Sequence, residues 1–130
     1  MLVCALFDAA AEKKWFARRG IFPIMHAVGV RRTLAHQNPG LTRRLYDLFK
    51  QAKDLAVADL EIIQVPKVTL PWPHAIVAEI RELMGYDFWP YGIAANANVL
   101  QTQLRWSSDD GLQARTVQIE DVFATDCLDT

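Results

Sequence analysis

His26 is the side chain of this sequence best suited to acid–base chemistry, because an imidazole changes its charge near neutral pH. It closes the segment GIFPIMH, residues 20–26, and lies within an alternating apolar run. A histidine in that position is a candidate proton donor. A core histidine that donates to a backbone carbonyl is the other interpretation, and the sequence leaves both open.

Arginine and aromatic side chains supply candidate binding groups. Arg18 and Arg19 precede Gly20, and a planar guanidinium holds a carboxylate through two parallel hydrogen bonds. A solvated helix end that complements the helix dipole explains the same pair. Trp89 and Tyr91 flank Pro90 and could line an aromatic pocket, or they could anchor their turn to the core. With Phe22 these four residues form the candidate substrate-binding set.

One strand is expected to present His26. From Ile21 to Val30 the sequence alternates with period two, which places Ile24, His26 and Val28 on one face. Residues 9–18 before it are good helix formers, and Gly20 is a typical helix stop.

Helical patterns dominate the rest of the chain. Asn38 and Pro39 indicate a helix start, and the apolar stripe predicts that this helix continues to about residue 60. Two further helices are predicted over about 74–84 and 94–106. A proline-marked connector over 61–73, an aromatic turn over 86–92 and a tail with a helical turn near 120–123 complete the pattern.

A lone strand among about four helices is an imbalance. A strand without a neighbour leaves its backbone N–H and C=O groups unpaired, and even a two-stranded ribbon is marginal in water. We therefore predict an α/β fragment, mostly helical with one main strand, whose sheet comes from other polypeptide. We also expect the chain to self-associate through the unpaired strand.

Composition excludes several classes of function. The chain has 130 residues, 52% hydrophobic and 22% charged, which fits one globular core without disorder. Its net charge of -1 gives no general attraction for nucleic acid or an anionic membrane. The three histidines show no metal-ligand spacing and no phosphate loop occurs, so we expect neither metal nor cofactor. Cys4 and Cys127 are expected to be reduced thiols.

Several motifs together resemble one enzyme family. GIFPIMH at 20–26, NPGL at 38–41, LPW at 70–72, ELMG at 82–85 and FWPYG at 88–92 occur in the order seen in the C-terminal part of the 4,5-dihydroxyphthalate decarboxylase family. The resemblance implies a type II periplasmic-binding-protein-like fold with two α/β lobes around a cleft. Residues 1–130 would be a single C-terminal segment with no internal domain boundary. We expect the family to carry a hydroxyl residue before Gly20, where this chain has Arg19.

The resemblance also implies a function. The family decarboxylates an aromatic ortho-diacid, so His26 would protonate the ring carbon that loses carbon dioxide, and the binding set would hold the aromatic acid. The expected role is a segment of a cytoplasmic carboxy-lyase, inactive alone because the cleft needs both lobes. The N-terminal residues lack the basic-first order of a secretory signal. The alternative is a segment of a solute-binding protein of an ABC transporter, which shares this fold.

Overall fold

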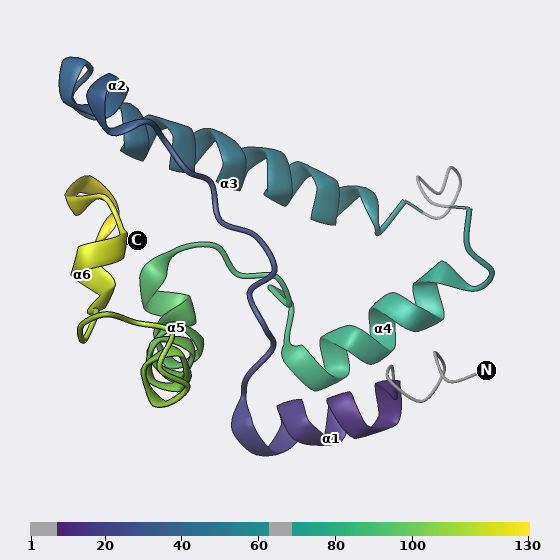
Figure 1. Cartoon of the computed structure of the whole chain (residues 1–130). Coiled ribbons are helices and arrows are strands. Elements are labelled where there is room, and N and C mark those ends of the chain that lie inside the picture. The colour runs from purple at the N-terminus through teal and green to yellow at the C-terminus, as the bar shows by residue number, and fades with distance from the viewer. Residues whose placement is uncertain (1–7, 63–68) are drawn as a thin grey trace.

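Helices make up the ordered part of the chain. The computed structural model describes residues 8–62 and 69–130, and in those ranges it has six α-helices, one 3₁₀ turn and no strand (Figure 1). The elements are α1 (Ala9–Arg19), α2 (Arg32–Gln37), α3 (Leu41–Asp59), α4 (Pro73–Met84), α5 (Ile93–Asp109), α6 (Ile119–Val122) and the 3₁₀ turn η2 (Thr125–Cys127). The mostly helical prediction is confirmed. None of the described helices combines the length and apolarity needed to cross a membrane.

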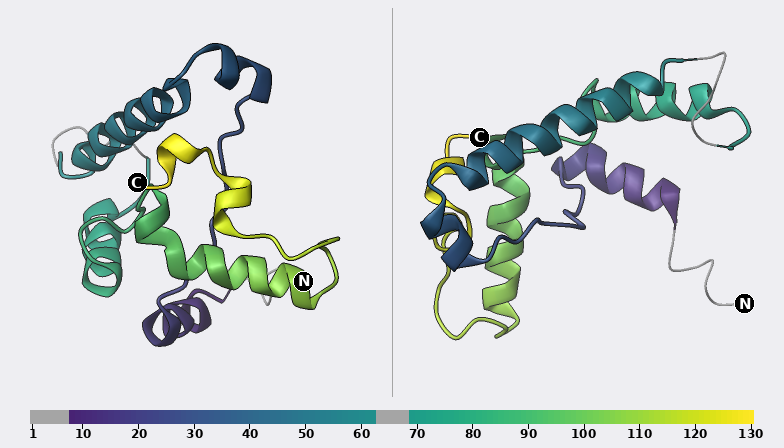
Figure 2. Two further views of the ribbon diagram at one scale, coloured as in Figure 1. Left: turned by 90° about the vertical axis from the view of Figure 1, so that its left-hand side faces the viewer. Right: turned by 90° about the horizontal axis from the view of Figure 1, so that it is seen from above.

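The helices form an open arrangement. Figure 2 shows α5 running crosswise to α3, while α1 lies alongside α4. An ion pair between Lys13 of α1 and Glu79 of α4 joins the second pair of helices. The tail, residues 119–130, curls back between the beginnings of α3 and α5 (Figure 2).

Local capping explains why α1 forms where predicted. The carboxylate of Asp8 accepts hydrogen bonds from the backbone N–H groups of Ala10 and Ala11, which supplies first-turn acceptors. Gly20 ends the helix with φ of 62°, a left-handed conformation that favours glycine. The predicted helix over 9–18 and its glycine stop are confirmed.

The predicted role of Asn38 as a helix start is wrong. Asn38 instead ends α2, and its side-chain amide donates to the carbonyl of Leu34 at 3.0 Å. The start moves to Gly40, whose φ of 75° turns the chain into α3. Helix α2 escaped prediction because its six residues are too few to show an apolar stripe.

The other helices agree with the sequence patterns. Helix α3 covers 41–59 of the predicted helix to residue 60, α4 ends at Gly85 as expected, and α5 runs three residues beyond Trp106. The predicted turn near 120–123 is α6. Cys127 is a free thiol, whereas Cys4 and the connector residue Pro66 lie outside the described residues.

The tail supplies the caps that two helices lack. Gly40 and Gly92 precede α3 and α5 and have no side chain to accept a first-turn N–H. The carboxylate of Asp126 accepts from the backbone N–H of Arg43 at 3.3 Å and from the hydroxyl of Thr42. The carbonyl of Thr130 accepts from the backbone N–H of Ala94 at 2.6 Å. A distant segment thus fixes the beginnings of both helices.

The strand predicted over 21–30 is absent from the structure. Figure 1 shows this segment as an irregular connection from α1 to α2 that passes in front of the connection between α4 and α5. No backbone–backbone hydrogen bond links residues 21–30 to the rest of the described chain. The physical reason is that the helices around it have no free backbone groups along their length with which a strand could pair.

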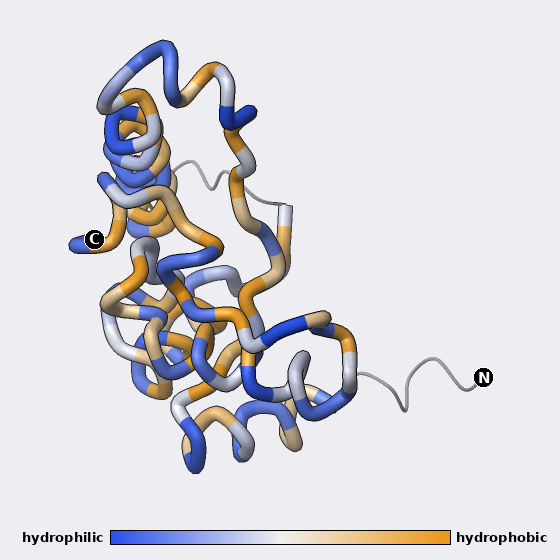
Figure 3. The backbone as a smooth tube through the Cα atoms, turned by 60° about the vertical axis from the view of Figure 1, so that its left-hand side comes forward, coloured by the Kyte–Doolittle hydropathy of each residue, from blue (hydrophilic) through white to orange (hydrophobic). Residues whose placement is uncertain are grey.

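Very little of the chain is buried. Within the described ranges the buried residues are Ile93, Leu100 and Thr102, all in α5, and each keeps 7–9% of its surface exposed. Large apolar side chains such as Val28 and Leu55 are 65% and 71% exposed. The hydropathy colouring shows apolar stretches on segments that no other element covers (Figure 3).

The solvent-accessible surface area shows how much burial the chain lacks. A compact protein of 14.7 kDa exposes about 6,900 Å². The chain exposes 10332 Å². Even if the thirteen residues outside the described ranges were as exposed as in an unfolded chain, they would explain only about 1,400 Å² of the difference. The described helices therefore expose roughly 2,000 Å² more than a self-contained domain would.

The cap on α3 gives a first prediction. We expect Asp126→Ala to lower the free energy of unfolding by about 1 kcal/mol, because α3 loses an acceptor for its first-turn N–H group. Asp129→Ala is the matched control and should have a much smaller effect, since this carboxylate pairs with Arg43 but is 73% exposed, and exposed pairs are screened by solvent. Urea titrations followed by circular dichroism measure both, and equal effects would contradict the capping role.

The same cap sets a pH dependence. The Thr42 hydroxyl, and behind it the Arg43 N–H, lower the pKa of Asp126 despite partial burial. A lowered folded-state pKa means that the stabilisation is complete above the unfolded value of about 3.9 and is lost as pH falls through the folded value. The stability difference between wild type and Asp126→Asn should therefore shrink in strong acid. A difference that grows there would contradict this assignment.

Candidate functional site

A large hollow lies beneath segment 20–30. It measures about 990 Å³ and is bounded by that segment, α3, the aromatic turn over 86–92, α5 and the tail. This is the upper end of the range for small-molecule pockets. Four of the six candidate site residues line it: Phe22, His26, Trp89 and Tyr91.

Two motifs distant in the sequence meet in this hollow. The rings of Phe22 and Trp89 contact edge to face, with centroids 5.6 Å apart and an interplanar angle of 61°. The contact joins GIFPIMH to FWPYG. Both rings are 38% exposed, so neither is sealed into a core.

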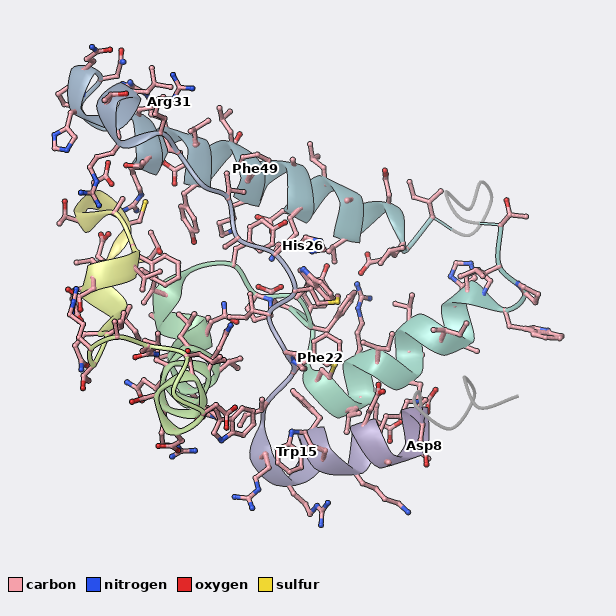
Figure 4. The ribbon with its side chains drawn as sticks, viewed as in Figure 1. Asp8, Trp15, Phe22, His26, Arg31 and Phe49 are labelled. Atoms are coloured by element: carbon pink, nitrogen blue, oxygen red, sulfur yellow. The ribbon has the colours of Figure 1, made fainter. Side chains whose placement is uncertain are left out.

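His26 faces this space without a partner. Its side chain is exposed, and no described residue hydrogen-bonds to its imidazole. Figure 4 shows it on the crossing segment, between Phe22 and the end of that segment at Arg31, with Phe49 reaching down from α3. The arrangement in this chain is that of an accessible imidazole beside aromatic rings, and the buried histidine held by a carbonyl is not observed.

Arg18 and Arg19 lie away from the hollow. The Nε of Arg18 donates to the carbonyl of Lys14 at 3.2 Å, within α1. The guanidinium of Arg19 lies over the ring of Trp15, 5.5 Å from its centroid. Both are exposed at the helix end, as in the alternative interpretation of this pair.

The aromatic turn is held from both sides. The side-chain amide of Asn96 donates to the carbonyls of Pro90 and Gly92 at 2.9 and 2.8 Å. From α3, the ammonium of Lys53 lies 2.8 Å from the carboxylate of Asp87 and 5.5 Å from the ring centroid of Tyr91. These contacts hold the turn that carries Trp89 and Tyr91.

Lys53 is the site residue that sequence reasoning missed. Its side chain is only 8% exposed, unlike that of Lys50, which is 48% exposed. The signal was available, because Lys53 follows Phe49 by four residues and so lies on the same side of α3. Burial by itself lowers the pKa of Lys53, but hydrogen bonds to Asp87 and Asp54 outweigh it, so the pKa is raised and the ammonium stays charged.

Arg81 is a second cation that the sequence did not single out. Its Nη1 donates to Glu61 at 2.9 Å and its guanidinium stacks on Tyr86, 4.4 Å from the centroid. The Nε and Nη2 atoms are buried and have no partner among the described residues. Arg81 does not line the hollow.

The charges of the hollow limit what it can do. Asp87 is the one charged side chain among the lining residues that the structure describes, and no lysine or arginine is among them. Burial, followed by the nearby Asp126 carboxylate, raises the pKa of the Cys127 thiol, so this lining cysteine is not a thiolate nucleophile. No group of three metal-ligating side chains occurs in the described part of the chain. The hollow can accept an aromatic ring and exchange a proton, but it offers a carboxylate no cation.

Comparisons with known proteins give one informative likeness. No protein-family model matches the sequence. The chain is 44% identical over 115 residues to a 4,5-dihydroxyphthalate decarboxylase of Comamonas testosteroni. The match covers 88% of this chain and 34% of the relative, so the chain spans about a third of that protein's length. The chain is thus related to one part of a decarboxylase.

The Lys53 contacts give a second prediction. We expect Lys53→Met to lower the free energy of unfolding by about 1 kcal/mol, because the charge-assisted hydrogen bond that joins α3 to Asp87 of the aromatic turn is lost, together with the ion pair to Asp54 within α3. Lys50→Met, which breaks an exposed pair with Asp54, should lower the urea midpoint much less. The urea denaturation midpoints of the two variants measure this difference. Equal midpoints would contradict the larger stabilising role of Lys53.

The stabilisation that Lys53 provides should depend on pH, because the pKa of its ammonium is raised in the folded protein. Such a group stabilises fully below its unfolded value of about 10.4, and the stabilisation is lost as pH rises through the folded value. The difference between wild type and Lys53→Met should therefore narrow in strongly alkaline solution.

Proposed function

We propose that this chain is one part of a cytoplasmic carboxy-lyase acting on 4,5-dihydroxyphthalate or a similar aromatic acid, and that it is inactive alone. The single observation that carries the proposal is the meeting of Phe22, His26, Trp89 and Tyr91 around one hollow. The likeness to a decarboxylase supports the reaction class. The proposed fold around the cleft is the two-lobed, type II periplasmic-binding-protein-like one.

The proposed chemistry uses each of these groups once. The aromatic rings stack on or edge against the substrate ring, and the phenol of Tyr91 can hydrogen-bond a ring substituent. As the bond between the ring and one carboxylate breaks, its electron pair goes to the ring carbon and carbon dioxide leaves. The imidazolium of His26 donates the proton that this carbon takes up.

The charges explain why the chain should be inactive alone. A diacid brings two negative charges, and holding them away from bulk water requires cationic or N–H donors. The described lining residues contain no lysine or arginine, and Arg18 and Arg19 lie elsewhere. The cations that balance the two carboxylates are therefore assigned to polypeptide outside this chain, and no binding role is proposed for Arg18 and Arg19.

A chimera tests the function. The matched segment of the Comamonas testosteroni decarboxylase is replaced by this chain, and release of carbon dioxide from 4,5-dihydroxyphthalate is measured. The chimera should turn over, whereas the 130-residue chain alone should not. His26→Gln in the chimera should lower kcat by at least about 100-fold, the usual contribution of a positioned acid.

His36→Gln is the matched control, because His36 lies in α2 and does not line the hollow. It should leave kcat unchanged. A chimera that binds the diacid without turnover would favour the solute-binding alternative, and full activity of His26→Gln would remove His26 as the proton donor.

A further inference from the structure

Asp87 differs from the other described residues around the hollow because it carries a charge. It lies in the aromatic turn over 86–92, two residues before Trp89, and it lines the same hollow as His26. Its side chain is 52% exposed, so a ligand in the hollow can reach it. A carboxylate accepts hydrogen bonds and donates none. Asp87 therefore offers a ligand an acceptor.

Lys53 holds one oxygen of this carboxylate. Its ammonium lies 2.8 Å from Oδ1 of Asp87, and Lys53 itself does not line the hollow. No hydrogen bond from a described residue reaches the other oxygen, Oδ2. The same ammonium lies 5.5 Å from the ring centroid of Tyr91, so the carboxylate lies close to an aromatic ring of the site. An aromatic ligand that packs against Tyr91 therefore brings its edge near this acceptor.

The charge of Asp87 is balanced within the protein. Lys53 also pairs with Asp54 at 3.3 Å, and Lys50 pairs with Asp54 at 2.7 Å. Together these two lysines and two carboxylates have no net charge. An anionic ligand therefore meets no strong net field from this group, and hydrogen bonding decides what Asp87 can contact.

The donors and acceptors of the proposed substrate decide which edge of its ring can face Asp87. The ring of 4,5-dihydroxyphthalate has two adjacent carboxylates on one edge and two adjacent hydroxyls on the opposite edge. The carboxylates are acceptors, as Asp87 is, and two acceptors cannot share a hydrogen bond. The hydroxyls are donors, and a hydrogen bond from a hydroxyl to a carboxylate is short and strong. The hydroxyl edge is the one that fits.

We propose that Asp87 determines specificity for the hydroxyl edge of the substrate, with Oδ2 accepting from a ring hydroxyl and Lys53 positioning the carboxylate. This inference rests on the proposed function and orients its substrate. The hydroxyls face the aromatic turn, and the carboxylates face the part of the site that this chain does not supply.

The same contact assists the proposed reaction. A hydroxyl that donates to a carboxylate gives more electron density to its ring, above all to the carbons ortho and para to it. In 4,5-dihydroxyphthalate the carbon para to each hydroxyl bears a carboxylate. The hydrogen bond to Asp87 thus favours the protonation of that carbon, which is the step assigned to His26.

Binding of the two halves of the substrate to the chimera tests the assignment. Catechol has the two hydroxyls without the carboxylates, and phthalate has the two carboxylates without the hydroxyls. Neither is the proposed substrate, so their dissociation constants can be measured at equilibrium by ligand-observed NMR titration. Both should bind the chimera, and a chimera that binds phthalate but not catechol would overturn the proposal.

Asp87→Asn is the informative variant. Its amide oxygen would accept from the ammonium of Lys53, which leaves the amide NH₂ group, a donor, in the place of Oδ2. Catechol should then bind at least about tenfold more weakly, which is the usual effect of losing a hydrogen bond to a charged group. Phthalate should not bind more weakly. Equal weakening of both ligands would mean that Asp87 only maintains the structure, and would overturn its role in specificity.

Asp54→Asn is the matched control. It removes the same charge and the same kind of contact with Lys53, but Asp54 does not line the hollow. Catechol should bind this variant as it binds the unmodified chimera, and equal catechol affinities of the two variants would contradict the proposal. These measurements are independent of turnover. An inactive chimera that loses catechol affinity with Asp87→Asn would sustain the hydroxyl contact and reject the reaction, whereas an active chimera with unchanged catechol affinity would do the reverse.

Discussion

The backbone of residues 21–30 is the constraint on which the rest of the structure depends. Ten consecutive residues have a strand-like pattern, yet no described part of the chain offers them a hydrogen-bonding edge. Because this segment cannot pair, it cannot bring α1 and α3 onto a common sheet, and their apolar sides stay open. The hollow around His26 has the same cause. This chain supplies only part of its walls.

Much of the helical structure followed from local sequence signals. Asp8 and Gly20 bound α1 as capping chemistry requires, and Gly85 ends α4. The start of α3 was misplaced because its cap is not local. Asn38 has the right side chain for a cap, but the acceptor comes from Asp126, more than eighty residues later, and no neighbouring pattern reports it. The predicted strand is absent for a related reason, because a strand forms only where a neighbouring backbone can pair with it.

For the candidate site too, local sequence signals predicted only part of the arrangement. Phe22 and Trp89 were named in one candidate binding set, and their rings are in contact. Residue type suggested Arg18 and Arg19 as carboxylate ligands, but a helix end directs them away from the hollow. Lys53 was overlooked because lysines on a helix are usually solvated, although its spacing from Phe49 placed it on the same side of α3. Its ion pair with Asp87 is visible only in the structure. Side-chain chemistry identifies candidates, and the tertiary contacts select among them.

Amide hydrogen exchange of residues 21–30 in the dilute lone chain, compared with the same residues in the chimera, tests most directly whether this segment depends on an external sheet. Exchange reports whether each N–H is hydrogen-bonded in the folded state. The account predicts near-unprotected exchange in the lone monomer and strong protection on alternate residues or throughout the segment in the chimera. Strong protection of these amides in a monomeric lone chain would contradict it, because the segment would then be paired within a self-sufficient fold.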